Sequence, residues 1–295
     1  MQRILVTGDQ GLIGTVLTRR LQDAGHEVIG YDVAGDKARD VIDKKSMDAL
    51  VATCTGVVHL AAVSRVILGE REPARCHLVN VQGTRNVLSA AARTGTRHPW
   101  ILYGSSREVY GQAEHLPVRE SAPLRPVNAY ACSKADAEKL VIASTDEVGL
   151  KTSIVRFSNV YGSVSDHSNR VAPAFARLAS QDEVLIVEGN RTTLDFTHVE
   201  DVAEGLLKII EVLSSGETLP TLHLVSGQGT MLTELAAMAT ELAGKGRVRI
   251  VEPRPYDVES FVGDPTQTDH TIGWRTTIPL RVGVGHLIEL FRQCQ

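Results

Sequence analysis

Tyr130 and Lys134 stand four residues apart in the segment "YACSK", at the start of a stretch with helical periodicity. Residues four apart share one face of a helix, so the phenol and the ammonium group are expected to lie side by side. A free tyrosine has a pKa of about 10, too high for a base at neutral pH. Because a nearby ammonium ion favours the phenolate, the pair is typical of general-base chemistry.

A second polar group follows the apolar run "WILYG", in "SSREVYG" (105–111). Glu108 could act as a base, whereas Arg107 is a permanent cation that cannot donate a proton at working pH. Its guanidinium could bind a carboxylate or phosphate with two parallel hydrogen bonds. The alternatives for Arg107 are a solvent-facing side chain or an ion pair with Glu114 or another nearby acid.

The elements around these residues alternate between strand and helix patterns. Short apolar runs predict strands at 3–7, 26–32, 56–61, 100–104 and 152–157, and helical periodicity marks 11–25, 73–95 and 128–149. Strands that are apolar along both faces indicate a parallel sheet covered by helices on each side. We therefore predict a doubly wound α/β fold.

After about residue 158 the pattern loosens and the predicted elements become shorter. Strands are expected at 183–189, 221–227 and 248–253, with helices at 199–213, 230–243 and 282–293. We predict a first domain over 1–158, with later elements at about 195–225 folding back onto it. Residues 159–295 form the expected smaller α/β lobe.

Three glycines, Gly8, Gly11 and Gly14, lie between the first strand and the first helix in "ILVTGDQGLIG". Glycines there allow a tight turn and let a pyrophosphate approach the positive end of the helix. Asp32, at the end of the second strand, could accept both ribose hydroxyls of an adenosine and would repel a 2′-phosphate. NAD is thus favoured over NADP. NADP stays an alternative because the cationic residues Lys37 and Arg39 lie close to Asp32 in the sequence.

The glycine pattern and several further motifs resemble the extended short-chain dehydrogenase/reductase superfamily, in its NAD-dependent epimerase/dehydratase branch. These motifs are "HLAA" (59–62), "NVQGTRNVL" (80–88), "SSREVYG" (105–111), "YACSK" (130–134), "RFSNVYG" (156–162), "DFTHVEDVA" (195–203) and "RPYDV" (254–258). The resemblance implies a Rossmann-type sheet with a substrate-binding lobe, NAD as cofactor and a nucleoside-diphosphate sugar as substrate. It also implies a homodimer formed through the helices around 73–94 and 130–148.

The resemblance assigns roles to individual residues. It implies Ser106, Tyr130, Lys134 and Glu108 as catalytic residues, and Ser106, Arg107, Asn159, Arg191 and Arg254 as substrate-binding residues. The cofactor residues it implies are Gly8, Gly11, Leu12, Ile13, Gly14, Asp32, Asp40, Val41, Leu60, Ala61, Ala62, Asn80, Tyr130 and Lys134. One departure is Leu194, where the family usually has a diphosphate-binding arginine; Arg191 could replace it from three residues upstream.

Several activities fit this pattern, and the leading one is a nucleotide-sugar epimerase, acting at carbon four through a transient keto-sugar. The dehydratases of the family carry an Asp-Glu pair where this chain has Arg107-Glu108, which disfavours dehydration by their route. A decarboxylase or dehydratase using Glu108 stays open, as does a sugar dehydrogenase or keto-sugar reductase. The intact Ser106, Tyr130 and Lys134 set argues against a non-catalytic sensor.

Composition limits the remaining possibilities. A formal net charge of −4 over 295 residues gives no electrostatic basis for binding nucleic acid. No run of eighteen apolar residues and no signal-peptide pattern is present, so neither a membrane span nor export is expected. The four cysteines have neither metal-ligand spacing nor disulfide density. We therefore expect a cytoplasmic protein without a metal.

Overall fold

The structure is a computed structural model that describes residues 1–95, 97–167, 169–254 and 258–294. Its contacts divide the chain into two compact units. Unit 1 consists of Met1–Gly111, Glu120–Phe157 and Ala203–His223, and unit 2 of Gln112–Arg119, Ser158–Val202 and Leu224–Gln295. The chain therefore passes between the units repeatedly, and one helix, α8 (Val199–Ser214), has residues in both.

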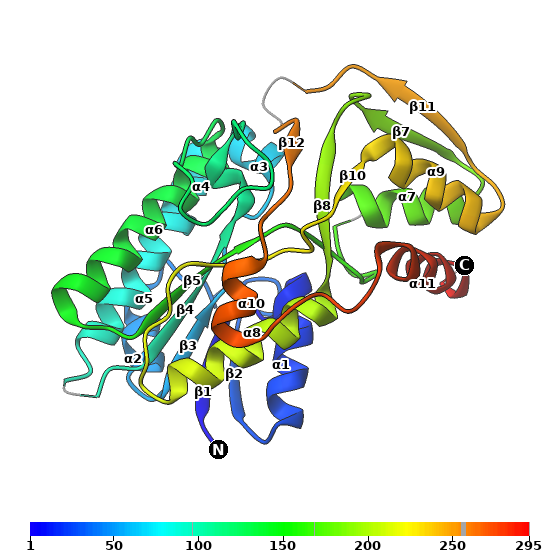
Figure 1. Cartoon of the computed structure of the whole chain (residues 1–295). Coiled ribbons are helices and arrows are strands. Elements are labelled where there is room, and N and C mark those ends of the chain that lie inside the picture. The colour runs from blue at the N-terminus through cyan, green and yellow to red at the C-terminus, as the bar shows by residue number, and fades with distance from the viewer. Residues whose placement is uncertain (96, 168, 255–257, 295) are drawn as a thin grey trace. The chain divides into compact units, whose positions relative to one another are not determined.

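Unit 1 is built on a six-stranded sheet (Figure 1). In spatial order its strands are β2 (Glu27–Tyr31), β1 (Arg3–Thr7), β3 (Gly56–His59), β4 (Trp100–Ser106), β5 (Thr152–Phe157) and β9 (Leu222–Leu224). The neighbouring pairs from β2 to β5 are all parallel. Strands β3 and β5 are buried along their whole length, as expected for strands covered on both faces. The predicted doubly wound α/β fold is confirmed.

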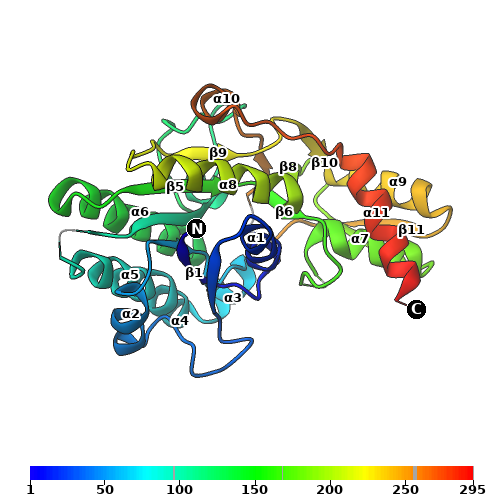
Figure 2. The same ribbon diagram turned by 90° about the horizontal axis from the view of Figure 1, so that it is seen from below.

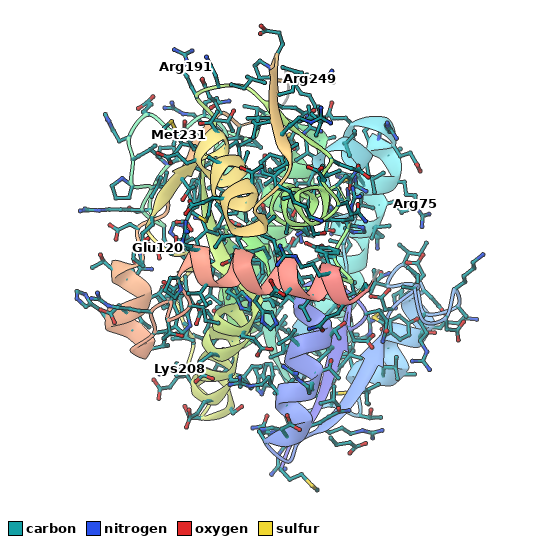
Figure 3. All side chains as sticks on the ribbon, turned by 90° about the vertical axis from the view of Figure 1, so that its right-hand side faces the viewer. Arg75, Glu120, Arg191, Lys208, Met231 and Arg249 are labelled. Carbon is teal, nitrogen blue, oxygen red and sulfur yellow. The ribbon has the colours of Figure 1, made fainter. Side chains whose placement is uncertain are left out.

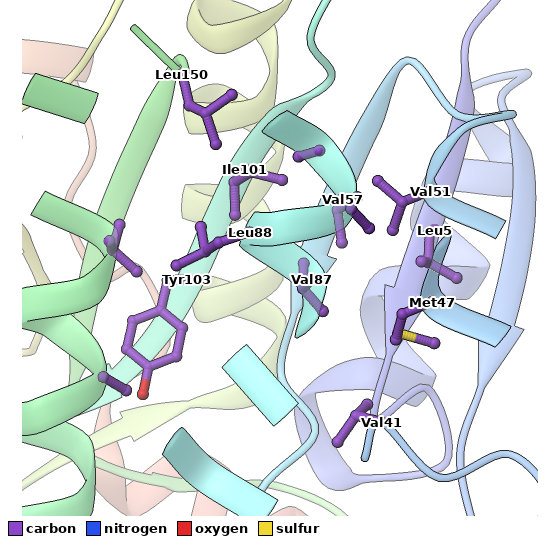
Figure 4. Packing of buried hydrophobic residues seen from close by; sticks show 14 of the residues in the cluster. Leu5, Val41, Met47, Val51, Val57, Val87, Leu88, Ile101, Tyr103 and Leu150 are labelled. Carbon is purple, nitrogen blue, oxygen red and sulfur yellow. The ribbon is translucent and has the colours of Figure 1, made fainter. Parts of the chain in front are cut away.

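Helices cover both faces of this sheet. On one face α5 (Gly83–Ala92) packs between α2 (Lys44–Val51) and α6 (Ala129–Val148). On the other face α1 (Leu12–Asp23) is joined to α8 by an ion pair between Arg20 and Glu204. Figure 4 shows the core beneath α5, where Val87 and Leu88 meet Leu5, Val57 and Ile101 of three strands. Burying such a side chain contributes about 1.5–3 kcal/mol, so this core holds β4 and α6 in register.

The single helix expected over 73–95 is interrupted. The segment consists of α4 (Pro73–His77), a π-helical turn η1 (Leu78–Gln82) and α5, and a short helix α3 (Val66–Arg71) precedes it. The turn places the Asn80 amide beside Val63, whose backbone N–H and C=O it binds at 2.8 and 3.2 Å. Hydrophobic periodicity does not encode such a widened turn, because a π turn shifts the helical phase only locally.

Unit 2 contains a four-stranded and a two-stranded sheet. In the first, β8 (Thr193–His198) pairs with β6 (Asn159–Tyr161), β10 (Gly229–Met231) and β12 (Ser260–Phe261). In the second, β7 (Val184–Glu188) pairs with β11 (Arg247–Val251). The helices are α7 (Val171–Ser180), α9 (Leu232–Ala243), α10 (Thr266–Ile272) and α11 (Leu280–Gln293). Figure 2 shows α7, α9 and α11 grouped beside β11, and they enclose the core of this unit.

The sequence predicts neither a membrane-spanning helix nor a metal site, and both points can be examined in the described residues. In the part of the chain that the structure describes, no helix is long and apolar enough to cross a membrane. The same residues hold no group of three His, Cys, Asp or Glu side chains that could bind a metal ion. All four cysteines are free thiols.

Candidate active site

The glycine turn has the shape that a dinucleotide phosphate requires. Gly8 adopts a φ of 78°, and a Cβ on Gly14 would overlap with the Gly8 carbonyl oxygen. Helix α1 begins after Gly11 without a side-chain cap, which leaves its first-turn amides, including those of Leu12 and Ile13, available to an anion. These residues therefore fit a pyrophosphate at the start of α1.

Asp32 follows β2 and is fixed by two backbone amides. Its Oδ1 accepts a hydrogen bond from Ala34 N at 2.8 Å, and its Oδ2 accepts one from Gln10 N at 3.2 Å. The carboxylate is thus tied to the glycine turn and suits ribose hydroxyls rather than a phosphate. Arg39 donates to the Gly30 carbonyl at 3.1 Å, so its guanidinium is held by the backbone of β2.

The other cofactor residues implied by the sequence fall into two groups. Asp40, Leu60, Ala61 and Ala62 are partly exposed, and Asp40 Oδ1 accepts from Ile42 N at 3.1 Å. In contrast, Val41 packs in the core of unit 1, and Asn80, 1 % exposed, donates to Ser133 Oγ at 2.8 Å. Asn80 therefore supports the protein's own chain, and a cofactor role for both stays a prediction.

Tyr130 and Lys134 occupy the first turns of α6, as predicted. Asn128 caps this helix by accepting from Ala131 N at 2.8 Å. Lys134 Nζ donates to the Gly104 carbonyl at 2.7 Å and lies 4.9 Å from the centre of the Tyr103 ring. Burial lowers the pKa of Lys134 to about 8. The ammonium ion therefore titrates much closer to neutral pH than that of an ordinary lysine.

Ser106, Arg107 and Glu108 lie at the junction of β4 and a 3-10 turn, η2 (Arg107–Tyr110). Ser106 Oγ accepts from Glu108 N at 3.2 Å. Arg107 and Glu108 are 8 and 7 % exposed and form an ion pair, with Nη2 2.8 Å from Oε1. The second oxygen, Oε2, accepts from Asn128 Nδ2 at 3.1 Å. The pair is thus turned away from solvent, and Glu108 supports the cap of the helix that carries Tyr130.

The substrate residues predicted for the later part of the chain lie in unit 2, and their side chains bind protein groups. Asn159 Nδ2 donates to the Asp195 carbonyl at 3.0 Å. Arg254 forms an ion pair with Glu188, with Nη2 3.0 Å from Oε2. Arg191 is 81 % exposed and 3.4 Å from Glu259, and Figure 3 shows it pointing outward. Residues 255–257, in the middle of the "RPYDV" motif, lie outside the described residues.

Leu194, which replaces the usual arginine, packs in the apolar core of unit 2 at 6 % exposure. The side chain at this position of β8 therefore serves packing in this protein. Arg191 and Leu194 belong to different environments, one exposed and one buried, so the structure does not bring Arg191 to the place of the missing arginine.

Glu138 and Arg156 were not predicted. They form a buried ion pair on α6 and β5, with Nη2 2.7 Å from Oε2. A signal was present, because Glu138 continues the four-residue spacing of Tyr130 and Lys134 along one helix face.

The comparison with protein families is decisive for the class of enzyme. The family model described as NAD dependent epimerase/dehydratase matches residues 4–221, more than half of the chain. The chain belongs to this family.

The relatives of this chain within the epimerase/dehydratase family differ from one another in activity. UDP-glucuronic acid decarboxylase 6 of Arabidopsis thaliana is 30% identical, over 98% of this chain and 89% of its own. The UDP-glucose 4-epimerase of Thermotoga maritima, solved with UDP-glucose, superposes with a TM-score of 0.91 at 26% identity and covers 99% of both chains. The Thermus thermophilus UDP-glucose 4-epimerase, solved with NAD, has a TM-score of 0.88 at 26% identity, over 98% of this chain and 99% of its own.

Family membership confirms three of the predictions. The chain is an NAD-dependent epimerase/dehydratase with a Rossmann-type fold, and its cofactor class is NAD. Nucleotide-sugar chemistry is supported for the family as a whole, but the relatives include decarboxylases, epimerases and a dTDP-glucose 4,6-dehydratase.

Proposed function

We propose that the protein is a nucleotide-sugar epimerase that inverts carbon four. The observation that carries this proposal is the engagement of Glu108, whose two oxygens accept from Arg107 and Asn128. A carboxylate whose two oxygens are engaged by a guanidinium and an amide is fixed in place. A lyase would need this group to exchange protons with the sugar, whereas an epimerase needs no second acid or base.

In the proposed mechanism the residues of α6 and β4 handle one proton. Tyr130, as the phenolate, accepts the proton of a sugar hydroxyl, with the Ser106 hydroxyl bridging the two. Lys134 stabilises the phenolate by its charge and is itself held by the Gly104 carbonyl. NAD, when bound by the glycine turn and Asp32, supplies the hydride acceptor and donor. The keto-sugar then rotates so that hydride returns to its opposite face, and the same tyrosine returns the proton to the sugar oxygen.

A nucleotide-sugar decarboxylase is the second candidate, and the 30% identity to a UDP-glucuronic acid decarboxylase favours it. In that case Arg107 would exchange its bond to Glu108 for one to the sugar carboxylate, releasing Glu108 as a base. A dTDP-glucose 4,6-dehydratase is also a structural neighbour, but Arg107 stands where the dehydratases of the family carry an acid, which disfavours their route. Net redox by a dehydrogenase or keto-sugar reductase is the remaining alternative. We also keep a homodimer and a cytoplasmic location as proposals.

The test is a product assay on the full chain with UDP-glucose and with UDP-glucuronic acid, read by mass and retention. An unchanged mass with altered retention supports the epimerase, and loss of carbon dioxide from UDP-glucuronic acid supports the decarboxylase. Loss of water or a change of two hydrogens would contradict both. Tyr130→Phe should reduce turnover by about 10²–10⁴-fold, while Lys151→Gln, at an exposed position, serves as a control. Full activity in Tyr130→Phe would remove the proposed base.

A further inference from the structure

The functional face of α6 extends beyond Lys134. Tyr130, Lys134 and Glu138 follow one another at four-residue intervals, and they are 7, 4 and 1 % exposed. Side chains at this spacing share one face of a helix. A carboxylate as buried as Glu138 is costly unless it is paired and hydrogen-bonded, so its partners indicate what it does.

Glu138 has three donors on neighbouring strands. Arg156 of β5 binds it in the bidentate manner, with Nε 2.9 Å from Oε1 and Nη2 2.7 Å from Oε2. Ser105 Oγ donates to Oε1 at 2.5 Å. Ser105 and Arg156 are register partners in the β4–β5 ladder. The carboxylate therefore joins α6 to the last residues of β4.

Arg156 also contacts Tyr110, at the other end of the segment 105–110. Its Nη1 donates to Tyr110 Oη at 2.6 Å and to the Glu120 carbonyl at 2.8 Å, and the guanidinium lies 4.9 Å from the centre of the Tyr110 ring. Ser105 and Tyr110 flank Ser106 and Glu108. The Glu138–Arg156 pair thus holds both ends of the segment that presents the proposed catalytic serine, while Lys134 holds Gly104.

Glu138 also acts on Lys134 through its charge. Burial lowers the pKa of Lys134, and the charges of Cys76 and then of Glu138 act in the opposite direction. The titratable and charged groups around Lys134 come from α6, α4, β3, β4 and β5. They are Tyr130, Glu138, Cys76, His59, Tyr103 and, through Glu138, Arg156. Glu138 is the carboxylate among these described neighbours, and its negative charge favours the ammonium form of Lys134.

We propose that Glu138 is a positioning residue of the active site, which holds Ser105 and thereby Ser106 against α6 and maintains the positive charge of Lys134 beside Tyr130. The inference rests on the proposed function, because it assigns Glu138 to the same proton-transfer residues. A buried ion pair that only stabilised the fold would leave the ionisation of Tyr130 unchanged.

The test measures that ionisation without a sugar substrate. The full chain with NAD is titrated with base, and phenolate formation is followed by ultraviolet absorbance. The difference between the unmodified chain and Tyr130→Phe reports Tyr130, and we expect its step to lie below pH 10. The variant Glu138→Gln/Arg156→Met removes both charges and keeps an acceptor for Ser105. Its Tyr130 step should lie on the order of one pH unit higher, since Lys134 loses its proton more easily.

Control variants separate the outcomes. Glu147→Gln neutralises an exposed acid on the same helix and should leave the step in place. Glu138→Asp keeps the charge, so its step should stay near that of the unmodified chain even if the double variant does not fold. If the Tyr130 ionisation occurs at the same pH in the double variant as in the unmodified chain, or shifts as far in Glu138→Asp as in the double variant, the role of Glu138 is overturned. If the unmodified chain shows no Tyr130 ionisation below pH 10, the assignment of Tyr130 as the base is overturned instead.

Discussion

At the scale of single residues, Lys134 shows how the proposed chemistry conflicts with stability. The ammonium ion is buried, and its pKa falls from 10.5 to about 8. In the unfolded chain the lysine stays charged up to pH 10.5, so below pH 8 both states are charged and folding bears the full cost of burying that charge. The cost is relieved as the pH rises from 8 to 10.5, because the folded state alone has lost its proton.

Lys134→Met should therefore stabilise the fold while abolishing turnover. We expect a gain in the free energy of unfolding of about 1–3 kcal/mol at pH 7, which shrinks as the pH approaches 10.5. Urea denaturation at pH 7 and pH 10 measures the difference. A variant that is less stable at pH 7 would indicate that the bond to Gly104 outweighs the cost of the charge.

His59 is a second residue whose burial predicts a pH dependence. Its ring lies between Thr7 Oγ1, at 2.7 Å, and Thr84 Oγ1, at 3.0 Å. Burial, and then the charge of Lys134, lowers the pKa of His59 from 6.5 to about 3. The unfolded chain takes up a proton below pH 6.5 that the folded state does not accept. The stability from this group is complete above pH 6.5 and is lost as the pH falls toward 3.

His59→Gln should remove that acid sensitivity. Between pH 7.5 and 5 the unmodified chain is expected to lose about 2 kcal/mol through His59, and the variant should lose correspondingly less. Denaturant titrations at the two pH values give the comparison, with the exposed His270→Gln as a control. Equal losses in His59→Gln and the unmodified chain would assign the acid sensitivity to other groups.

At the scale of elements, the long periodic segments were predictable and the site contacts were not. The strands 3–7 and 152–157 have the predicted bounds, because both are continuous apolar runs. Helix α7 and strands β6 and β8 were not predicted, and β6 has only three residues. Arg107 and Glu108 were singled out from the sequence, but their mutual ion pair was not, since a 3-10 turn decides which way each side chain points.

Helix α11 offers a matched pair of substitutions within one element. A Cβ on Gly283 would overlap with Tyr161, whereas one on Gly285 would meet only Leu242, at 4.0 Å. Gly283→Ala should destabilise the protein by about 1–3 kcal/mol through overpacking. Gly285→Ala should stabilise it by about 0.5–1 kcal/mol, through the higher helix propensity of alanine. Thermal melts of both variants check the packing of unit 2; equal effects would contradict it.

At the scale of the whole molecule, unit 1 cannot be obtained as one continuous piece. Residues 203–223 complete it with most of α8 and part of β9, the strand beside β5. A fragment of residues 1–158 would expose the β5 edge and the face that α8 covers. We expect this fragment to lack a cooperative thermal transition by circular dichroism. A cooperative melt that NAD shifts upward would show that these later residues are dispensable.

The spacing of Tyr130, Lys134 and Glu138 has a consequence for insertions and deletions. Each residue added to or removed from an α-helix rotates everything beyond it by about 100°. Loss of one residue between Tyr130 and Glu138 would turn the acid away from Arg156 and Ser105, whatever residue was lost. Surface positions of α6 can change freely in identity, but the number of residues between its first and third turns cannot vary. This helix is therefore constrained in phase more strictly than in composition.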